Sequence, residues 1–111
     1  MAINIRYHES NSGKIFIKDY IGSLDEKAQY EIYSFLQKFK NDYRFRQSPY
    51  CKKIVKDIFE IRIKVKDCYR ILYAFLYKDT VILLHIFKKK TNKIPKKDLN
   101  LAINRLKLYE Q

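Results

Sequence analysis

Three apolar runs follow one another over residues 59–87, and they constrain the fold more than any other part of the chain. Only two short polar breaks, at 66–67 and 78–79, separate these runs. Parallel strands need a long crossover between them, whereas antiparallel strands can be joined by a tight turn. The spacing therefore predicts three consecutive antiparallel strands connected by hairpins.

The first of these runs alternates almost strictly between apolar and charged residues. Apolar side chains occupy the odd positions from 59 to 65, and charged side chains occupy the even positions from 60 to 66. This period of two predicts a strand with one buried face and one charged face, which carries Arg62. The runs 69–77 and 81–87 are apolar at both odd and even positions, which is typical of central strands covered on both sides.

The flanking segments predict a further strand and three helices. Residues 3–7 alternate like a strand, and residues 14–21 form a short helix that Gly22 ends. An amphipathic helix runs to about Tyr43, and Ser23 and Glu26 form a capping box at its start. Residues 44–57 are a connector that brings Lys52, Lys53 and Lys56 towards the sheet, although 51–57 also fits a short strand.

A last helix of about fourteen residues starts at Pro95, which suits a first helical turn. The resulting order is strand, helix, helix, three strands, helix (β-α-α-β-β-β-α). It predicts an α+β fold in which one layer of helices covers a mostly antiparallel sheet. Residues 1–111 are expected to form a single domain, since this length can bury a core of its own.

The charge of the chain is strongly positive and unevenly spread. The 24 Lys and Arg exceed the 12 Asp and Glu by twelve, and residues 52–111 carry 16 basic and 6 acidic side chains, a net of +10. Such a field attracts polyanions. Two cysteines make no disulfide framework, and no apolar run is long enough for a membrane span. We expect a soluble cytoplasmic protein with reduced thiols and no membrane partner.

Several familiar kinds of active site are improbable in this sequence. There is no Gly-rich phosphate loop and no Cys/His metal spacing, and the acidic residues are scattered singly, which disfavours a two-metal nuclease. We therefore expect no metal and no cofactor. Cations remain, and they suit RNA cleavage in which a ribose 2′-hydroxyl attacks its own 3′ phosphate. Arginine binds phosphate bidentately, and a lysine crowded by cations can transfer protons.

The candidate residues also have structural interpretations. Arg62 and Arg70 stand inside strands, where each could face solvent or pair with Glu60 instead of binding phosphate. The Lys88–Lys93 run could be a solvated strand end. His85, in an apolar strand, fits a core histidine better than a general acid. The tyrosines at 69, 73 and 77 fit core packing better than base stacking.

A series of short motifs then follows in a fixed order along residues 59–105. They are Phe59-Glu60-Ile61-Arg62, Tyr69-Arg70-Ile71-Leu72-Tyr73, Leu83-Leu84-His85-Ile86-Phe87, Lys89-Lys90-Thr91, Lys93, Pro95, Asp98, Ala102 and Arg105. This segment resembles the RelE-like toxins of bacterial toxin–antitoxin pairs, and among them the HigB and phage-derived group. Residues 1–58 resemble these toxins only in the order of elements.

The resemblance implies a RelE-like fold and an mRNA endonuclease that cuts at the ribosome without a metal. It also implies neutralisation by a small antitoxin, usually with a helix-turn-helix domain. By position, Arg62 and Arg70 match the cations that hold and activate the scissile phosphate, and Lys90 matches the cation after the last strand. The RNA is expected to contact five further residues: Lys64, Lys88, Lys89, Thr91 and Lys93.

One departure from the family pattern leaves the general base unassigned. Lys96 falls near the position where RelE has a tyrosine in its C-terminal segment. His85, which we include among the catalytic candidates, a lysine, or the remote Tyr109 could take that role. Two other functions stay open: a ParE-like toxin acting on DNA gyrase, and a non-enzymatic basic module that binds RNA, DNA or a protein.

Overall fold

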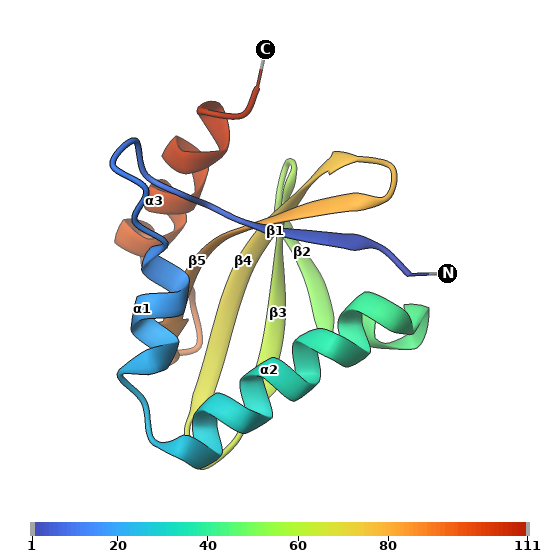
Figure 1. Ribbon diagram of the computed structural model, residues 1–111, viewed down its shortest axis with the longest axis vertical. Coiled ribbons are helices and arrows are strands. Elements are labelled where there is room, and N and C mark those ends of the chain that lie inside the picture. Colours follow the sequence, from blue (N-terminus) through green and yellow to red (C-terminus); the bar gives the residue numbers. More distant parts are fainter. Residues whose placement is uncertain (1, 111) are drawn as a thin grey trace.

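A computed structural model describes residues 2–110 of the chain (Figure 1). Its elements, in order, are β1 (Asn4–Tyr7), α1 (Phe16–Gly22), α2 (Glu26–Asn41), the 3₁₀ helix η1 (Tyr43–Arg46), β2 (Cys51–Val55), β3 (Ile58–Lys64), β4 (Cys68–Tyr77), β5 (Thr80–Lys88) and α3 (Lys96–Lys107). This confirms the α+β class, with one strand more than the predicted order. No helix within residues 2–110 is long and apolar enough to cross a membrane.

The five strands form one sheet in the order β1-β5-β4-β3-β2. The three predicted antiparallel strands are confirmed as β3, β4 and β5, which are neighbours in the sheet. β1 pairs with β5 in parallel, so β1 and β2 form the two edges. The sheet is mostly antiparallel, as predicted.

Strand β2 corrects the prediction of a connector over residues 44–57. It forms a hairpin with β3, and Asp57 in the turn between them has a φ of 67°, a conformation that Asp tolerates better than most residues. The strand is short, lies at the edge and carries lysines at 52 and 53, so it has little of the apolar alternation that identifies buried strands.

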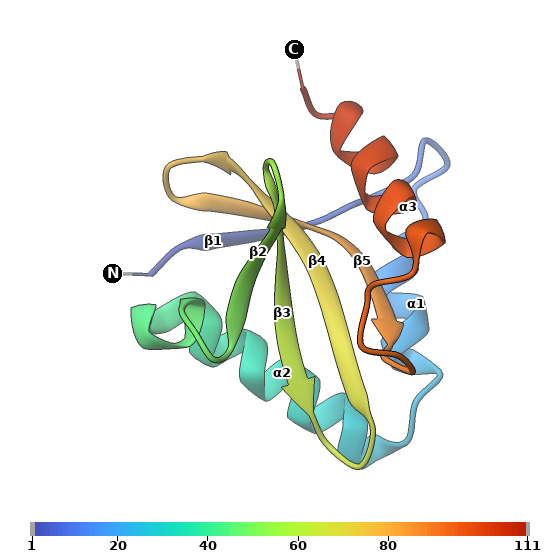
Figure 2. The ribbon, with the colours of Figure 1, turned by 180° about the vertical axis from the view of Figure 1, so that it is seen from behind.

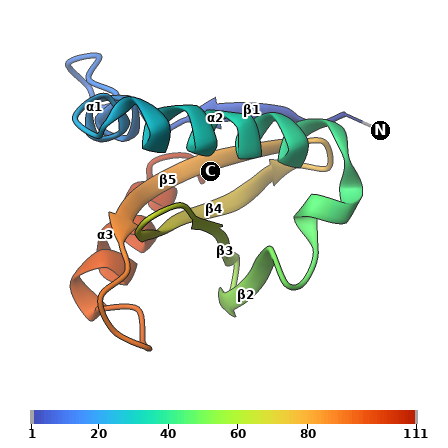
Figure 3. The same ribbon diagram turned by 90° about the horizontal axis from the view of Figure 1, so that it is seen from below.

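Helices cover both faces of the sheet, so the prediction of one helical layer is wrong. Figure 3 shows α1 and α2 on one face of the sheet and α3 on the other. Figure 2 shows the molecule from behind, with α3 on the near side. Ile71 and Leu83 pack with α2 in one core, whereas Leu72 and Leu84 pack with Ala102 of α3 in a second core. The prediction that the central strands are covered on both sides is confirmed.

The start of α2 differs from the predicted capping box. Asp25 is the N-cap, and its carboxylate accepts from the Ala28 amide at 2.8 Å. Ser23 instead ends α1 with helical backbone angles, and its hydroxyl donates to the Tyr20 carbonyl. An N-cap residue needs an extended backbone, which Asp25 has and Ser23 lacks. α2 ends at Asn41, and α3 has 12 residues.

Candidate phosphate-binding site

The side-chain alternation of β3 places Glu60 and Arg62 on the face that α3 covers. Ile61 and Ile63, between and beyond them, are buried in the core under α2. In the β3–β4 register Arg62 lies directly opposite Arg70. The expectation that Arg62 shares the charged face of its strand is therefore confirmed.

A buried carboxylate lies between the two arginines. Arg62 donates through Nε to Glu60 Oε1 at 2.8 Å, and Arg70 Nε lies 3.6 Å from Glu60 Oε2. The Glu60 and Arg70 side chains are only 5% and 10% exposed, whereas that of Arg62 is 38% exposed. An unpaired buried carboxylate would be strongly disfavoured, so the two guanidinium groups stabilise it and it fixes their positions in return. The pairing with Glu60, left open by the sequence, is formed.

These three side chains line a cavity of about 320 Å³, which we call the phosphate cavity. The cavity lies between β2, β3, β4, the end of β5 and the segment leading into α3. Its lining consists of Lys52, Lys53, Ile54, Glu60, Arg62, Arg70, Phe87, Lys89, Asn92, Lys93, Ile94 and Leu99. Six cations thus surround one carboxylate. Within residues 2–110 none of the four lysines forms an ion pair, so the cavity suits an anion such as phosphate.

The lysine run after β5 divides between the two faces of the sheet. Lys89 and Lys93 line the phosphate cavity. Lys88 is opposite Tyr69, which belongs to the core under α1 and α2, and its ammonium lies 3.3 Å from Asp67. The structure therefore separates Lys88 from the cavity, although its neighbour in sequence lines it.

Three other expected site residues lie outside the cavity lining. Lys64 is exposed at the end of β3, and Lys90 is exposed just after β5. The Thr91 hydroxyl donates to the Lys93 carbonyl at 2.7 Å, so it shapes the segment that carries Lys93.

His85 stands behind the wall of the phosphate cavity. Its ring stacks on Phe87, a lining residue, with centroids 5.7 Å apart, and its Nε2 lies 2.6 Å from Asp98 Oδ1 of α3. Burial lowers the pKa of His85, and the hydrogen bond to Asp98 offsets that only in part. The neutral imidazole donates from Nε2 to the Asp98 carboxylate. This hydrogen bond holds the start of α3, and the stacked ring of His85 holds Phe87 in place.

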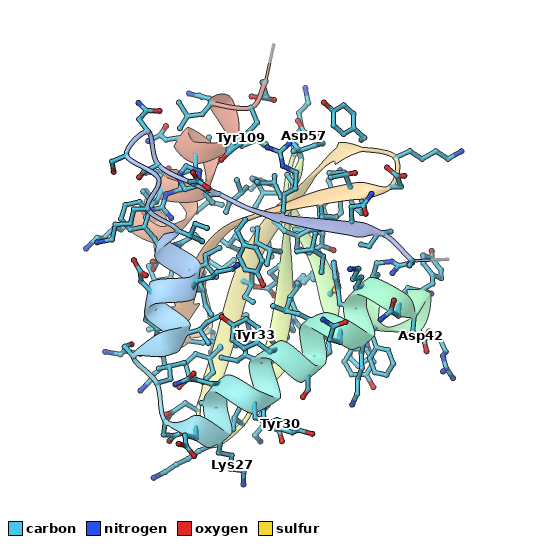
Figure 4. All side chains as sticks on the ribbon, viewed as in Figure 1. Lys27, Tyr30, Tyr33, Asp42, Asp57 and Tyr109 are labelled. Carbon is cyan, nitrogen blue, oxygen red and sulfur yellow. The ribbon has the colours of Figure 1, made fainter. Side chains whose placement is uncertain are left out.

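Tyr109 is far from the cavity along α3. Its hydroxyl accepts from the Glu9 amide at 3.1 Å and lies 2.9 Å from His8 Nδ1. Figure 4 shows it beyond the C-terminal end of α3, whereas the cavity contacts α3 at Leu99, near the N-terminal end. The structure does not bring this base candidate to the arginines.

Sequence reasoning missed Phe87 and Asn92 as lining residues. Phe87 lies opposite Arg70 in the pairing of β4 with β5, which has two irregularities, between Leu72 and Tyr73 and between Phe75 and Tyr77. No local sequence signal marks these irregularities. Lys52 and Lys53 do reach the sheet as expected, because β2 pairs with β3. Among residues 2–110 no three His, Cys, Asp or Glu side chains are grouped to hold a metal ion.

The family described as Phage derived protein Gp49-like (DUF891) has a model that matches residues 19–107. This match covers most of the chain. The protein belongs to the Gp49-like family. Proteins of this family are known as RelE-like toxins and are associated with toxin–antitoxin pairs, which implies an antitoxin partner. No curated protein matches the chain.

Proposed function

We propose that this Gp49-like protein is the toxin of a type II toxin–antitoxin pair and cleaves translated mRNA at the ribosome without a metal. The observation that carries the proposal is the pair of arginines held by one buried glutamate at the wall of a lysine-rich cavity. Family membership supports the toxin class, and the cavity supports a phosphodiester as the group on which it acts.

In this proposal the arginines hold the scissile phosphate while the ribose 2′-hydroxyl attacks it. Arg62 is the more exposed of the two, and its bond to Glu60 uses Nε. No hydrogen bond within residues 2–110 uses its two terminal nitrogens, so they can bind two phosphate oxygens. Lys89 and Lys93 contact flanking phosphates and stabilise the charge that develops on the phosphorane. Lys64, Lys90 and Thr91 contact RNA beyond the cavity.

Proton transfer falls to a lysine in this arrangement. Of the three kinds of base candidate, the lysines reach the phosphate cavity, whereas Tyr109 binds His8 and the His85 ring lies behind Phe87. His85 therefore acts as a positioning residue for the cavity wall. Of the lysines that line the cavity, Lys89 is the nearest to His85 in the sequence, just after the end of β5.

Expression of variants in bacteria tests this proposal. Wild type should arrest growth and leave shortened mRNAs with codon-phased ends. Arg62→Ala, alone or with Arg70→Ala, should lower the cleavage rate by roughly 10²- to 10³-fold, the scale of losing one transition-state contact. Lys89→Ala should weaken cleavage, and its sequence neighbour Lys88→Ala should not, because Lys88 faces the other side of the sheet. Thermal unfolding verifies that each variant folds.

Three outcomes would contradict the proposal in different ways. If the folded variant with both Arg62→Ala and Arg70→Ala still arrests growth fully, the two arginines are not the catalytic site. DNA breaks without shortened mRNAs would identify a toxin that acts on gyrase. RNA binding without cleavage, even when ribosomes are supplied, would leave a non-enzymatic basic module.

A further inference from the structure

A second cavity lies on the opposite face of the sheet from the phosphate cavity, beyond the C-terminal end of α2. It holds about 800 Å³, and we call it the aromatic groove. Figure 1 shows the elements around it: β1, η1 and the β4–β5 hairpin. Aromatic rings and cations line it, among them Phe59, Tyr73, Phe75, Tyr77, Arg46 and Lys78.

The floor of the groove is a cluster of three rings on the sheet. Phe59 lies 5.5 Å from both Tyr73 and Phe75, and these two are 5.9 Å apart, measured between ring centroids. Phe75 is 46% exposed because α2 ends at Asn41 and leaves this part of the sheet uncovered. Phe59 is half-buried, and Tyr73 is buried against Phe39 of α2. Phe75 is therefore the exposed ring of the cluster, and an exposed aromatic side chain in a concave surface is typical of an interaction site.

Cations surround this apolar floor. Lys52 and Lys53 lie on one side in β2, and Lys78 lies on the other in the β4–β5 turn. Within residues 2–110 none of these three ammonium groups forms an ion pair, and Asp79 is the one acidic residue of the lining. An apolar centre with a charged rim is the arrangement of a protein–protein interface.

We propose that the aromatic groove docks an amphipathic segment of an acidic partner protein. Apolar side chains of that segment would insert over the rings of Phe59 and Phe75, and its carboxylates would pair with the lysines at the rim. A second copy of this chain is a poor occupant, since two bodies of net charge +12 repel each other. Single-stranded RNA is a poorer fit, because successive bases stack on successive exposed rings, and of the three rings of the floor Phe75 is the exposed one. This inference is independent of RNA cleavage.

Selection of peptides from a displayed random library on the purified chain tests the docking. The selected peptides should combine aromatic or aliphatic anchors with Asp or Glu. Tyr77→Ala, which removes a groove residue that is 68% exposed, and Lys78→Glu should each weaken their binding by about tenfold or more. These variants spare Lys52 and Lys53, which also line the phosphate cavity.

Matched controls come from outside the groove. Tyr30, 70% exposed and placed on the side of α2 away from the sheet (Figure 4), serves as Tyr30→Ala, and exposed Lys107 serves as Lys107→Glu. Both should leave peptide binding unchanged. All four variants should arrest growth as wild type does. Peptide binding therefore tests the docking proposal, and growth arrest separately tests the proposed nuclease.

Specific results would overturn the docking proposal. They are selected peptides without acidic residues, or peptide binding that the Tyr77 and Lys78 variants do not change. If Tyr77→Ala instead weakens binding of an oligouridylate as strongly as Arg62→Ala does, the groove binds RNA. If sedimentation shows a wild-type dimer that Tyr77→Ala dissociates, the groove is an interface between copies of the chain.

Discussion

His8, which is buried, and His85, which is partly buried, connect strands to α3 and to the residues just after it. His8, at the end of β1, contacts Tyr109, and His85 binds Asp98, so each ties a strand to α3 or to the residues just after it. Burial lowers the pKa of both imidazoles, and the nearby Arg105 guanidinium lowers it further. Both side chains are therefore neutral at neutral pH in the folded protein.

This protonation state predicts an acid sensitivity of the fold. In the unfolded chain both histidines titrate near the usual pKa of 6.5, so the unfolded state binds more protons once the pH falls through that value. The free energy of unfolding should fall as the pH drops below this value, before carboxylates titrate near pH 4. His85→Gln with His8→Asn should flatten the dependence in urea unfolding between about pH 7.5 and about pH 5.5. If the unfolding free energy of the double variant depends on pH as steeply as that of wild type, the two histidines do not cause the acid sensitivity.

At the scale of elements, the turn between α1 and α2 determines where the long helix begins. Gly22 ends α1, Ser23 follows with helical angles, and the chain is extended at Asp25. The Asp25 carboxylate then binds one of the amides that the first turn of α2 leaves without a helical partner.

Two alanine substitutions separate the roles of these residues. Asp25→Ala should cost about 1 kcal/mol of unfolding free energy, as expected for loss of an N-cap. Ser23→Ala should cost less than about 0.5 kcal/mol, since it removes an exposed bond to the Tyr20 carbonyl. Denaturant midpoints measure both. Equal losses of unfolding free energy in the two variants would contradict the assignment of Asp25 as the N-cap.

At the scale of the whole molecule, the positive charge is collected at one site by the sheet. The phosphate cavity combines cations from β2, β3, β4 and the segment after β5, which are distant in sequence. Five of its six cations are at least partly exposed, and Arg70 is the buried one. These five can each neutralise a phosphate of a bound single strand.

This count predicts the salt dependence of RNA binding. The logarithm of the association constant should fall with the logarithm of the salt concentration. The five cavity contacts, at about −0.7 each, contribute about −3.5 to the slope, and Lys64 and Lys90 beyond the cavity make it steeper. Lys89→Ala with Lys93→Ala should reduce the magnitude of the slope by about 1.4. Lys27→Ala, an exposed position at the start of α2 away from the cavity (Figure 4), should not change it. Fluorescence anisotropy across a salt series measures all three proteins.

Several features of this protein follow from its sequence alone. The period of two in residues 59–65 places Arg62 beside Glu60, and the doubly apolar runs predict central strands. The apolar positions of α2 predict its buried face, which Ile32 and Phe39 occupy. These predictions succeed because a side chain's face within one element depends only on its distance along the chain from its neighbours.

Other features depend on contacts between residues that are distant in the sequence. The lysine-bearing edge strand β2 forms because β3 offers it a partner, and α3 covers the second face because the strands leave an apolar surface there. The pairing of β4 with β5 places Phe87 opposite Arg70, and the segment after β5 brings Lys89 and Lys93 to the same cavity as the two arginines. The sequence determined the periodicity of each element and the excess of cations. The tertiary structure alone decided which cations meet, because strand register and helix placement result from packing between elements.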